Sequence, residues 1–244
     1  MNMLKRTAII GALLTLPLGA WGATTSAPAE TAQASKSVKA TPTYKPPLRG
    51  APAGRIGGGT RGASERESFS LQVLAPDHVG NTTQEQPCLY WYISKSTGYP
   101  VELTVTERKA VQPLLEKTLT APGEGGIQSA CLADYGVKLR RNVQYKWFVT
   151  LVIDPERRSK DILAGGMLTV VDPPSSLDEK LKAADQNSAP DIYAEEGLWY
   201  DAIDSVSKML DAAPGNDGLR AWRSSLLEQV GLTEVAAHEK TRGQ

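Results

Sequence analysis

Residues 101–107 read Val-Glu-Leu-Thr-Val-Thr-Glu, with an apolar side chain at every second position. Successive side chains of a β-strand point to opposite faces of its sheet, so the valines and the leucine share one face while Glu102 and the two threonines share the other. Residues 68–74, Ser-Phe-Ser-Leu-Gln-Val-Leu, show the same alternation. One buried face and one solvated face are typical of antiparallel sheets.

Five further runs rich in apolar residues have strand length and are separated by turn residues; they cover 89–93, 114–119, 127–132, 145–153 and 162–171. No apolar stripe of helix length interrupts the chain between residues 68 and 171, which disfavours βαβ units and a parallel sheet. About seven short strands at this spacing predict a mainly β domain over residues 49–173, an immunoglobulin-like antiparallel β-sandwich.

The pattern changes after Pro173, and residues 174–238 predict an α-helical extension. Ser176 with Glu179 three positions later is typical of a capping box at a helix start. Within the extension, residues 193–214 have the spacing of one tetratricopeptide-like helical hairpin, in which Gly197 would let two helices approach. The alternative is a helical cap packed on the sandwich, because such repeats usually need about three copies for stability.

The first 23 residues have the layout of a secretory signal peptide: Lys5 and Arg6, an apolar run over 7–18, then small residues. Cleavage is expected near residues 20–23 or near 34. The run is shorter than the about 20 residues that a membrane-spanning helix needs, so no stable membrane anchor is expected. Residues 24–48 are rich in Ala, Thr, Ser and Pro and predict a disordered linker. We therefore expect a periplasmic or secreted protein.

Removal of the signal peptide leaves 25 basic and 27 acidic residues, a formal charge of −2. This balance does not favour a nucleic-acid partner. The chain has two cysteines, Cys88 and Cys131, and an exported pair tends to form a disulfide. Such a bridge would contribute about 3 to 4 kcal/mol through loop closure. The alternative is two separately buried thiols.

Three sequence blocks carry a family resemblance: Gly-Gly-Gly-Thr-Arg-Gly at 57–62, Tyr-Trp-Tyr-Ile at 90–93, and Tyr-Lys-Trp-Phe at 145–148 leading to Asp-Pro-Glu-Arg-Arg-Ser at 154–159. With them, the chain resembles the exported bacterial family known as domain of unknown function 928, over about residues 49–232. The resemblance implies export and a shared fold. Because that family has no established activity, it implies no catalytic residue.

The sequence shows no catalytic constellation. Nucleophilic catalysis needs a base beside the nucleophile, and the chain has two histidines, His78 and His238. We interpret His78 as a solvated loop residue and place His238 in a charged tail. A zinc site is not expected, because the cysteines are better used as a bridge, and no cofactor is predicted. A hydrolase would need acids such as Glu102 or Asp154 to meet in three dimensions.

Two arginine groups are candidates for contact with a partner or an anion. Arg49, Arg55 and Arg61 lie in a glycine-rich segment that is not a phosphate-binding P-loop, because no strand precedes it and no lysine follows. The alternative is a close backbone crossing in which these arginines pair with surface carboxylates. Arg157 and Arg158 lie in residues 154–161, where Asp-Pro turn chemistry predicts a hairpin and a calcium or anion site is the alternative.

Aromatic side chains offer one more hypothesis, since exposed tryptophans can stack on sugars. Because the chain has only two phenylalanines, we interpret its tryptophans as core material instead. The leading hypothesis is a non-enzymatic interaction or accessory module of the cell envelope or a secretion system, with another envelope or secreted protein as its partner. A carbohydrate-binding protein and a hydrolase with an unrecognised carboxylate site are the alternatives.

Overall fold

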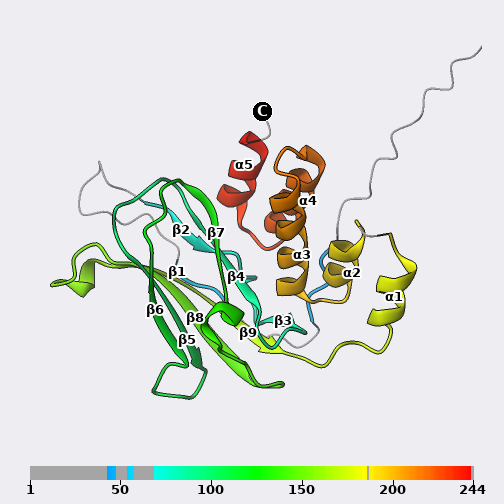
Figure 1. Cartoon of the computed structure of the whole chain (residues 1–244), viewed down its shortest axis with the longest axis horizontal. Helices are drawn as coiled ribbons and strands as arrows, with labels where there is room; N and C mark the ends of the chain where they lie inside the picture. Colours follow the sequence, from blue (N-terminus) through cyan, green and yellow to red (C-terminus); the bar gives the residue numbers. More distant parts are fainter. Residues whose placement is uncertain (1–42, 48–53, 58–68, 186, 243–244) are drawn as a thin grey trace, which may run out of the picture. The chain divides into compact units, whose positions relative to one another are not determined.

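The computed structural model describes residues 43–47, 54–57, 69–185 and 187–242, all of which belong to the unit 40–244. Within them the chain first forms nine β-strands in two sheets and then five α-helices (Figure 1). The protein is therefore mainly β with a helical C-terminal part, as the sequence predicted. The expected signal peptide, residues 1–23, lies outside the described residues.

The larger sheet has the strand order β1-β9-β8-β5-β6, and β3 adds to β9 as well. Its strands are β1 (Ile56–Gly57), β3 (Gly80–Thr82), β5 (Val101–Glu107), β6 (Leu115–Leu119), β8 (Gln144–Leu151) and β9 (Ile162–Val170). All pairs are antiparallel except β3 with β9. The alternation in β5 has the predicted effect, because Val101, Leu103 and Val105 are buried and their neighbours are half-buried.

The smaller sheet is antiparallel, with the order β2-β4-β7; its strands are β2 (Leu71–Val73), β4 (Cys88–Ile93) and β7 (Gly126–Cys131). All six residues of β4 are buried. One face of this sheet contacts the larger sheet through β2, and the other is covered by helices (Figure 1). A strand covered on both faces shows no alternation of polarity.

The strand count differs from the expected seven. Nine strands lie in the described residues, and two of the short ones, β1 and β3, have two and three residues. Neither has a repeating polarity pattern, since periodicity needs a longer run to be visible. Short 3₁₀ turns over Leu132–Tyr135 and Arg158–Lys160 complete the β part.

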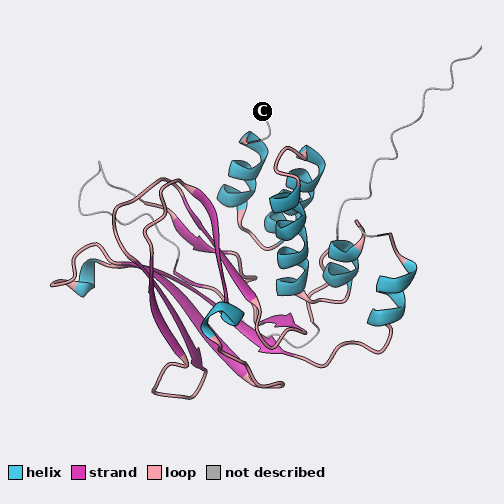
Figure 2. Ribbon diagram, in the orientation of Figure 1, coloured by secondary structure: helices cyan, strands magenta, loops and turns pink. Residues whose placement is uncertain are grey.

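Five helices follow: α1 (Leu177–Ala183), α2 (Ala189–Glu195), α3 (Trp199–Ala212), α4 (Asp217–Gln229) and α5 (Thr233–Thr241). They lie together on one side of the strands (Figure 2). Helix α1 begins after Ser176, as predicted, but the serine side chain makes no capping hydrogen bond. The expected capping box is therefore incorrect, although the boundary is right.

Helices α2–α5 form two similar pairs rather than the single predicted hairpin. Gly197 follows the C-terminal cap of α2 at φ +73°, and Gly231 follows that of α4 at φ +74°. In both places the glycine N–H donates to the carbonyl of the residue three positions before it. The N–H of the leucine that follows donates to the carbonyl five positions before that leucine, and the two bonds together form a Schellman motif. The two glycines are 34 positions apart, the period of tetratricopeptide repeats. Gly197 thus ends a helix and does not sit between packed helix faces.

Large side chains of α3 attach the helices to the strands. The Trp199 indole N–H donates to the Leu74 carbonyl (2.9 Å), and the Tyr200 hydroxyl donates to the Met167 carbonyl (3.0 Å). Trp147 in β8 donates to the Tyr200 oxygen (3.0 Å). These residues are fully or almost fully buried, so strands and helices share one core.

Residues 43–47 differ from the expected disordered linker. Tyr44 is 7% exposed, and its ring lies edge-on to Trp199 with centroids 4.9 Å apart. Its backbone N–H donates to the Gln229 side chain (3.0 Å), and the Lys45 N–H donates to the Ala194 carbonyl (3.0 Å). One aromatic anchor and two backbone bonds join the end of the predicted linker to the helices. The remainder of 24–48 lies outside the described residues.

Candidate functional site

The predicted disulfide is present. Cys88 and Cys131 are directly opposite each other in the pairing of β4 with β7, and their sulfur atoms are bonded. The bridge joins the first residue of one strand to the last residue of its neighbour. It therefore fixes one end of the smaller sheet.

The first arginine group is only partly described, since Arg49 and Arg61 lie outside the described residues. Arg55 donates from one nitrogen, Nη1, to the carbonyls of Ala75 (3.2 Å) and Val230 (3.1 Å). It therefore links the loop after β2 to the end of α4. Both bonds are within the chain, so this guanidinium serves the packing of strands against helices.

The second arginine group lies in the connection between β8 and β9, which is a hairpin, as expected. Arg157 Nε is 2.5 Å from Asp154, and Arg158 is 2.5 Å from both Asp161 and Glu102. Lys160 also pairs with Asp154, at 3.6 Å. Because three cations meet three carboxylates, this exposed cluster is balanced and offers little excess charge to an anion. The two acids considered for hydrolysis, Glu102 and Asp154, are both bound in it.

Neither histidine has the predicted surroundings. The His78 side chain is 15% exposed, and its Nε2 is 2.8 Å from the Tyr44 hydroxyl, so it is not a solvated loop residue. His238 lies in the last turn of α5, with its ring 5.0 Å from that of Tyr92. Burial lowers the pKa of His238, and the nearby Arg242 lowers it further. Among the described residues, no three His, Cys, Asp or Glu side chains are grouped to hold a metal ion.

The four tryptophans of the described part are core residues, as interpreted from composition; they are Trp91, Trp147, Trp199 and Trp222, at 7% exposure or less. None therefore offers a ring face to a sugar. No helix among the described residues is long and apolar enough to cross a membrane.

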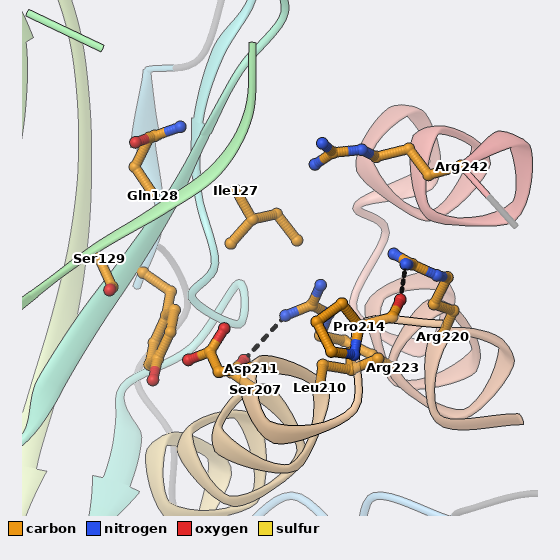
Figure 3. A pocket seen from close by; sticks show the side chains of 11 residues that line it. Ile127, Gln128, Ser129, Ser207, Leu210, Asp211, Pro214, Arg220, Arg223 and Arg242 are labelled. Carbon is orange, nitrogen blue, oxygen red and sulfur yellow. Dashed lines mark hydrogen bonds between the residues drawn. The ribbon is translucent and has the colours of Figure 1, made fainter. Parts of the chain in front are cut away.

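A cavity of about 490 Å³ lies between the smaller sheet and the helices (Figure 3). Its volume is in the range of ligand-binding pockets, and its wall is mainly polar. Strands β4 and β7 supply one side, and α3, α4, α5 and the loop after α3 supply the other. The lining residues are Tyr90, Ile127, Gln128, Ser129, Ser207, Leu210, Asp211, Pro214, Arg220, Arg223 and Arg242.

The base of the cavity is a buried ion pair. Arg223 of α4 contacts a carboxylate oxygen of Glu239 of α5 through Nη2 (2.6 Å) and Nε (2.8 Å). Its Nη1 donates to the Ser207 hydroxyl of α3 (3.0 Å). The two charged side chains are 10% and 2% exposed. Because Glu239 neutralises Arg223, this pair connects three helices but leaves no net charge for a ligand.

Arg220 and Arg242 supply the uncompensated positive charge. Neither forms an ion pair with a carboxylate among the described residues. Arg220 donates to the Pro214 carbonyl, but its buried Nε has no hydrogen-bond partner in the described part of the chain. Figure 3 shows Arg242 directed from the end of α5 toward β7. A buried donor without a partner is costly, and the remaining N–H groups of the two guanidiniums are suited to an anionic ligand.

The other side of the cavity is an edge of the smaller sheet, since among the described residues β7 pairs with β4 alone. The Leu74 N–H donates to the Tyr90 carbonyl, and the Ser94 N–H donates to the Ser70 carbonyl. The even-numbered residues of β4 therefore form the hydrogen bonds to β2. In an antiparallel ladder these bonds alternate, and the odd-numbered residues of β4 bond β7. Trp91 is opposite Gln128.

This alternation places Gln128 in the ladder to β4 and directs the N–H and C=O groups of Ile127 and Ser129 away from it. No described residue bonds these four groups. Three consecutive residues of β7 line the cavity, although neighbouring side chains point to opposite faces. The cavity therefore reaches the backbone edge of the strand, and it combines guanidinium groups with unpaired peptide groups.

A smaller cavity of about 300 Å³ contains two carboxylates, Asp201 and Asp204. Asp201 accepts the backbone N–H (3.0 Å) and hydroxyl (2.7 Å) of Thr83, and Asp204 accepts the Tyr90 hydroxyl (2.9 Å) and pairs with Lys208 (2.7 Å). Burial raises the pKa of Asp201, while its hydrogen bonds oppose the rise. Both acids thus hold α3 against the strands.

Sequence reasoning did not identify the arginine cavity. Arg220 and Arg223 are three positions apart and so share one face of α4, which is the only local signal. Their position opposite β7 depends on packing between segments about a hundred residues apart in the chain.

The fold and the cavity define a class of protein: a two-sheet β protein with C-terminal helices that enclose an arginine-lined pocket against a sheet edge. The chain belongs to the family described as Domain of Unknown Function (DUF928), whose model matches residues 56–240. This confirms the resemblance found in the sequence.

Other comparisons add little. One similar solved structure is a crystal structure of a multi-domain immunophilin from Arabidopsis thaliana, with 8% sequence identity, a TM-score of 0.19, and coverage of 80% of this chain and 100% of that chain. The comparison with curated proteins gave no match.

Proposed function

We propose that this protein is an exported, non-enzymatic interaction module of the cell envelope or a secretion system, and that it binds an anionic group of its partner in the arginine cavity. The observation that carries the proposal is the pair Arg220 and Arg242 in a cavity of about 490 Å³ beside an unpaired strand edge. Guanidinium groups recognise carboxylate and phosphate by paired hydrogen bonds.

The proposed binding role accords with the chemistry of the described residues that line the cavity. Asp211 is the one carboxylate among the described residues that line it, and no histidine is among them. Acid–base catalysis usually needs a proton donor and acceptor in reach of the same substrate. The disulfide between Cys88 and Cys131 is compatible with the proposed periplasmic or secreted location, where such bonds persist.

We also infer that the two sheets form an immunoglobulin-like sandwich. In the constant-type domain one sheet holds strands A, B, E and D and the other holds C, F and G. The orders β2-β4-β7 and β9-β8-β5 support the assignments A-B-E and G-F-C, with β6 as an added strand beside C. In this assignment, no described strand occupies position D, beyond β7. The disulfide joins neighbouring strands of one sheet, whereas in antibody domains it joins two sheets.

Photo-crosslinking in the native cell tests the proposal. A photoreactive amino acid replaces Ser129, which is exposed at the cavity, or Thr118, which is exposed on β6. We expect a discrete crosslinked species from the cavity position, carrying an exported protein, and none from Thr118. The photoreactive residue is then placed at two further cavity positions, Gln128 and Asp211. If none of the three cavity positions gives a discrete species, or if they give only the species that Thr118 gives, the cavity is not an interaction site.

A further inference from the structure

We propose that the arginine cavity binds an extended acidic stretch of polypeptide, which adds to the smaller sheet as a strand beside β7 and places a carboxylate on Arg220 and Arg242. The inference rests on the proposed function, because it names the part of the partner that the cavity recognises. Three properties of the cavity support it: the strand edge, the distribution of charge and the shape of the wall.

The strand edge supplies main-chain recognition. Ile127 and Ser129 each direct one N–H and one C=O away from β4, and no described residue bonds them. An added strand can pair with these groups at the spacing of an ordinary ladder, which is how many domains bind extended peptides. Ser129 is exposed and Ile127 half-buried, so the edge is accessible from solvent.

The charge distribution selects an acidic side chain over a polyanion. Arg220 projects from α4 and Arg242 from the end of α5, and both lie across the cavity from β7 (Figure 3). Asp211 of α3 lines the same cavity and has no ion-pair partner among the described residues. A uniformly negative polymer would meet this carboxylate with repulsion, whereas a peptide can place a carboxylate at the arginines and a neutral or basic residue at Asp211.

The wall between these groups is suited to alternating side chains. Ile127 and Ser129 share the helix-facing side of β7, because their partners in β4, Tyr92 and Tyr90, contact α5 and α3. Leu210 and Pro214 add apolar surface from the helices. A strand beside β7 directs every second side chain toward this wall. We therefore expect acidic residues at alternate positions of the bound peptide.

The test is a selection of random ten-residue peptides displayed on phage against the immobilised full-length protein. Counter-selection uses the double variant Arg220→Gln with Arg242→Gln. We expect enriched peptides with Asp or Glu at alternate positions. Lack of enrichment over the double variant, or enrichment of peptides without acidic residues, would overturn the peptide proposal. The proposed interaction function would still stand if native crosslinks at Ser129 persisted, so the two failures are distinguishable.

An enriched peptide is then measured by fluorescence anisotropy against single variants. Arg220→Gln and Arg242→Gln should each weaken binding about tenfold, the usual effect of losing a hydrogen bond to a charged group. The matched control is Arg108→Gln, an exposed arginine that bonds Gln144 of the larger sheet and does not line the cavity, and it should leave Kd within about twofold. Equal losses in all three variants would indicate nonspecific charge attraction and overturn the proposal.

Strand addition needs a separate readout. The same peptide, N-methylated at alternate residues in either phase, keeps its charge but loses main-chain donors, and one phase should lose binding while the other retains it. Ser129→Pro removes an edge N–H without breaking the ladder to β4 and should also prevent binding. If both methylated peptides bind as the parent does, no strand forms. Inorganic phosphate or trigalacturonate binding as tightly as the peptide, through the same arginines, would show that the site takes a free anion or an acidic sugar instead.

Discussion

The buried ion pair at the base of the cavity gives a quantitative prediction. The Glu239 side chain is 2% exposed and contacts two nitrogens of Arg223, whose side chain is 10% exposed. Glu239→Gln keeps the shape and one acceptor oxygen but removes the negative charge. Arg223 would then be a buried cation whose side-chain partners among the described residues are a neutral amide oxygen at position 239 and the Ser207 hydroxyl.

Breaking a buried pair by removing one partner typically costs about 3 to 5 kcal/mol. Because glutamine retains one acceptor, we expect the lower end, about 3 kcal/mol of the free energy of unfolding. For a chain of this size each kcal/mol lowers Tm by about 2 to 4 °C, so the midpoint should fall by roughly 6 to 12 °C. The loss should persist in high salt, since screening acts weakly on buried charges.

Urea unfolding followed by tryptophan fluorescence measures this difference. The matched control is Glu228→Gln, because Glu228 pairs with Lys240 across the same two helices but is about half exposed; its loss should be at most about 1 kcal/mol. A double variant with leucine at Arg223 and Glu239 should recover most of the loss, since an apolar pair needs no counter-charge. If Glu239→Gln and Glu228→Gln differ by less than about 1 kcal/mol, the pair is not buried as described.

Three further predictions concern other contacts. Burial lowers the folded-state pKa of His238 below its unfolded value of about 6.5, so the unfolded chain binds the proton more tightly. The free energy of unfolding should therefore fall as the pH drops through about 6.5 and level off below the folded-state pKa. His238→Gln should flatten that slope in urea titrations at pH 5 to 8. Changing Cys88 and Cys131 together to alanine should cost about 3 to 4 kcal/mol, and a reducing agent should then have no further effect on Tm. Tyr44→Phe, which removes only the bond to His78, should cost about 1 kcal/mol, whereas Tyr44→Ala should cost about 3 or more by calorimetry; equal losses would contradict an aromatic anchor.

Much of the fold could be predicted because its longer strands have a local period. In β5 every second residue is buried, and the run at 145–153 corresponds to β8, with the pattern of buried and half-buried residues from Gln144 to Val149. The change to helices after Pro173 was equally visible. The number of helices could not be predicted, because α5 is weakly amphipathic and its sequence resembles a charged tail. In the structure α5 nevertheless packs beside β2, where Glu234 accepts hydrogen bonds from Ser70 and Gln72.

Contacts distant in sequence could not be predicted in the same way. His78 follows a proline and an aspartate in a loop, and nothing local indicates that Tyr44 covers it. The cavity depends on the same kind of contact, because Arg220 and Arg242 acquire a common position only after α4 and α5 pack together. Two of the arginines that the sequence did single out, Arg157 and Arg158, have nearby carboxylates that already bind them.

Gly126 leaves room for two side chains from the end of the helical part at the start of β7. It begins β7 at φ +128°, and a Cβ atom there would lie 3.0 Å from Nη1 of Arg242 and 3.5 Å from Nε2 of His238. A side chain at this position would strain the backbone and displace the flexible end of Arg242. The glycine thus leaves room for the Arg242 guanidinium at the start of β7. Charge recognition and strand addition can act on one ligand only where the guanidinium and the strand edge lie close together, and Gly126 permits that approach.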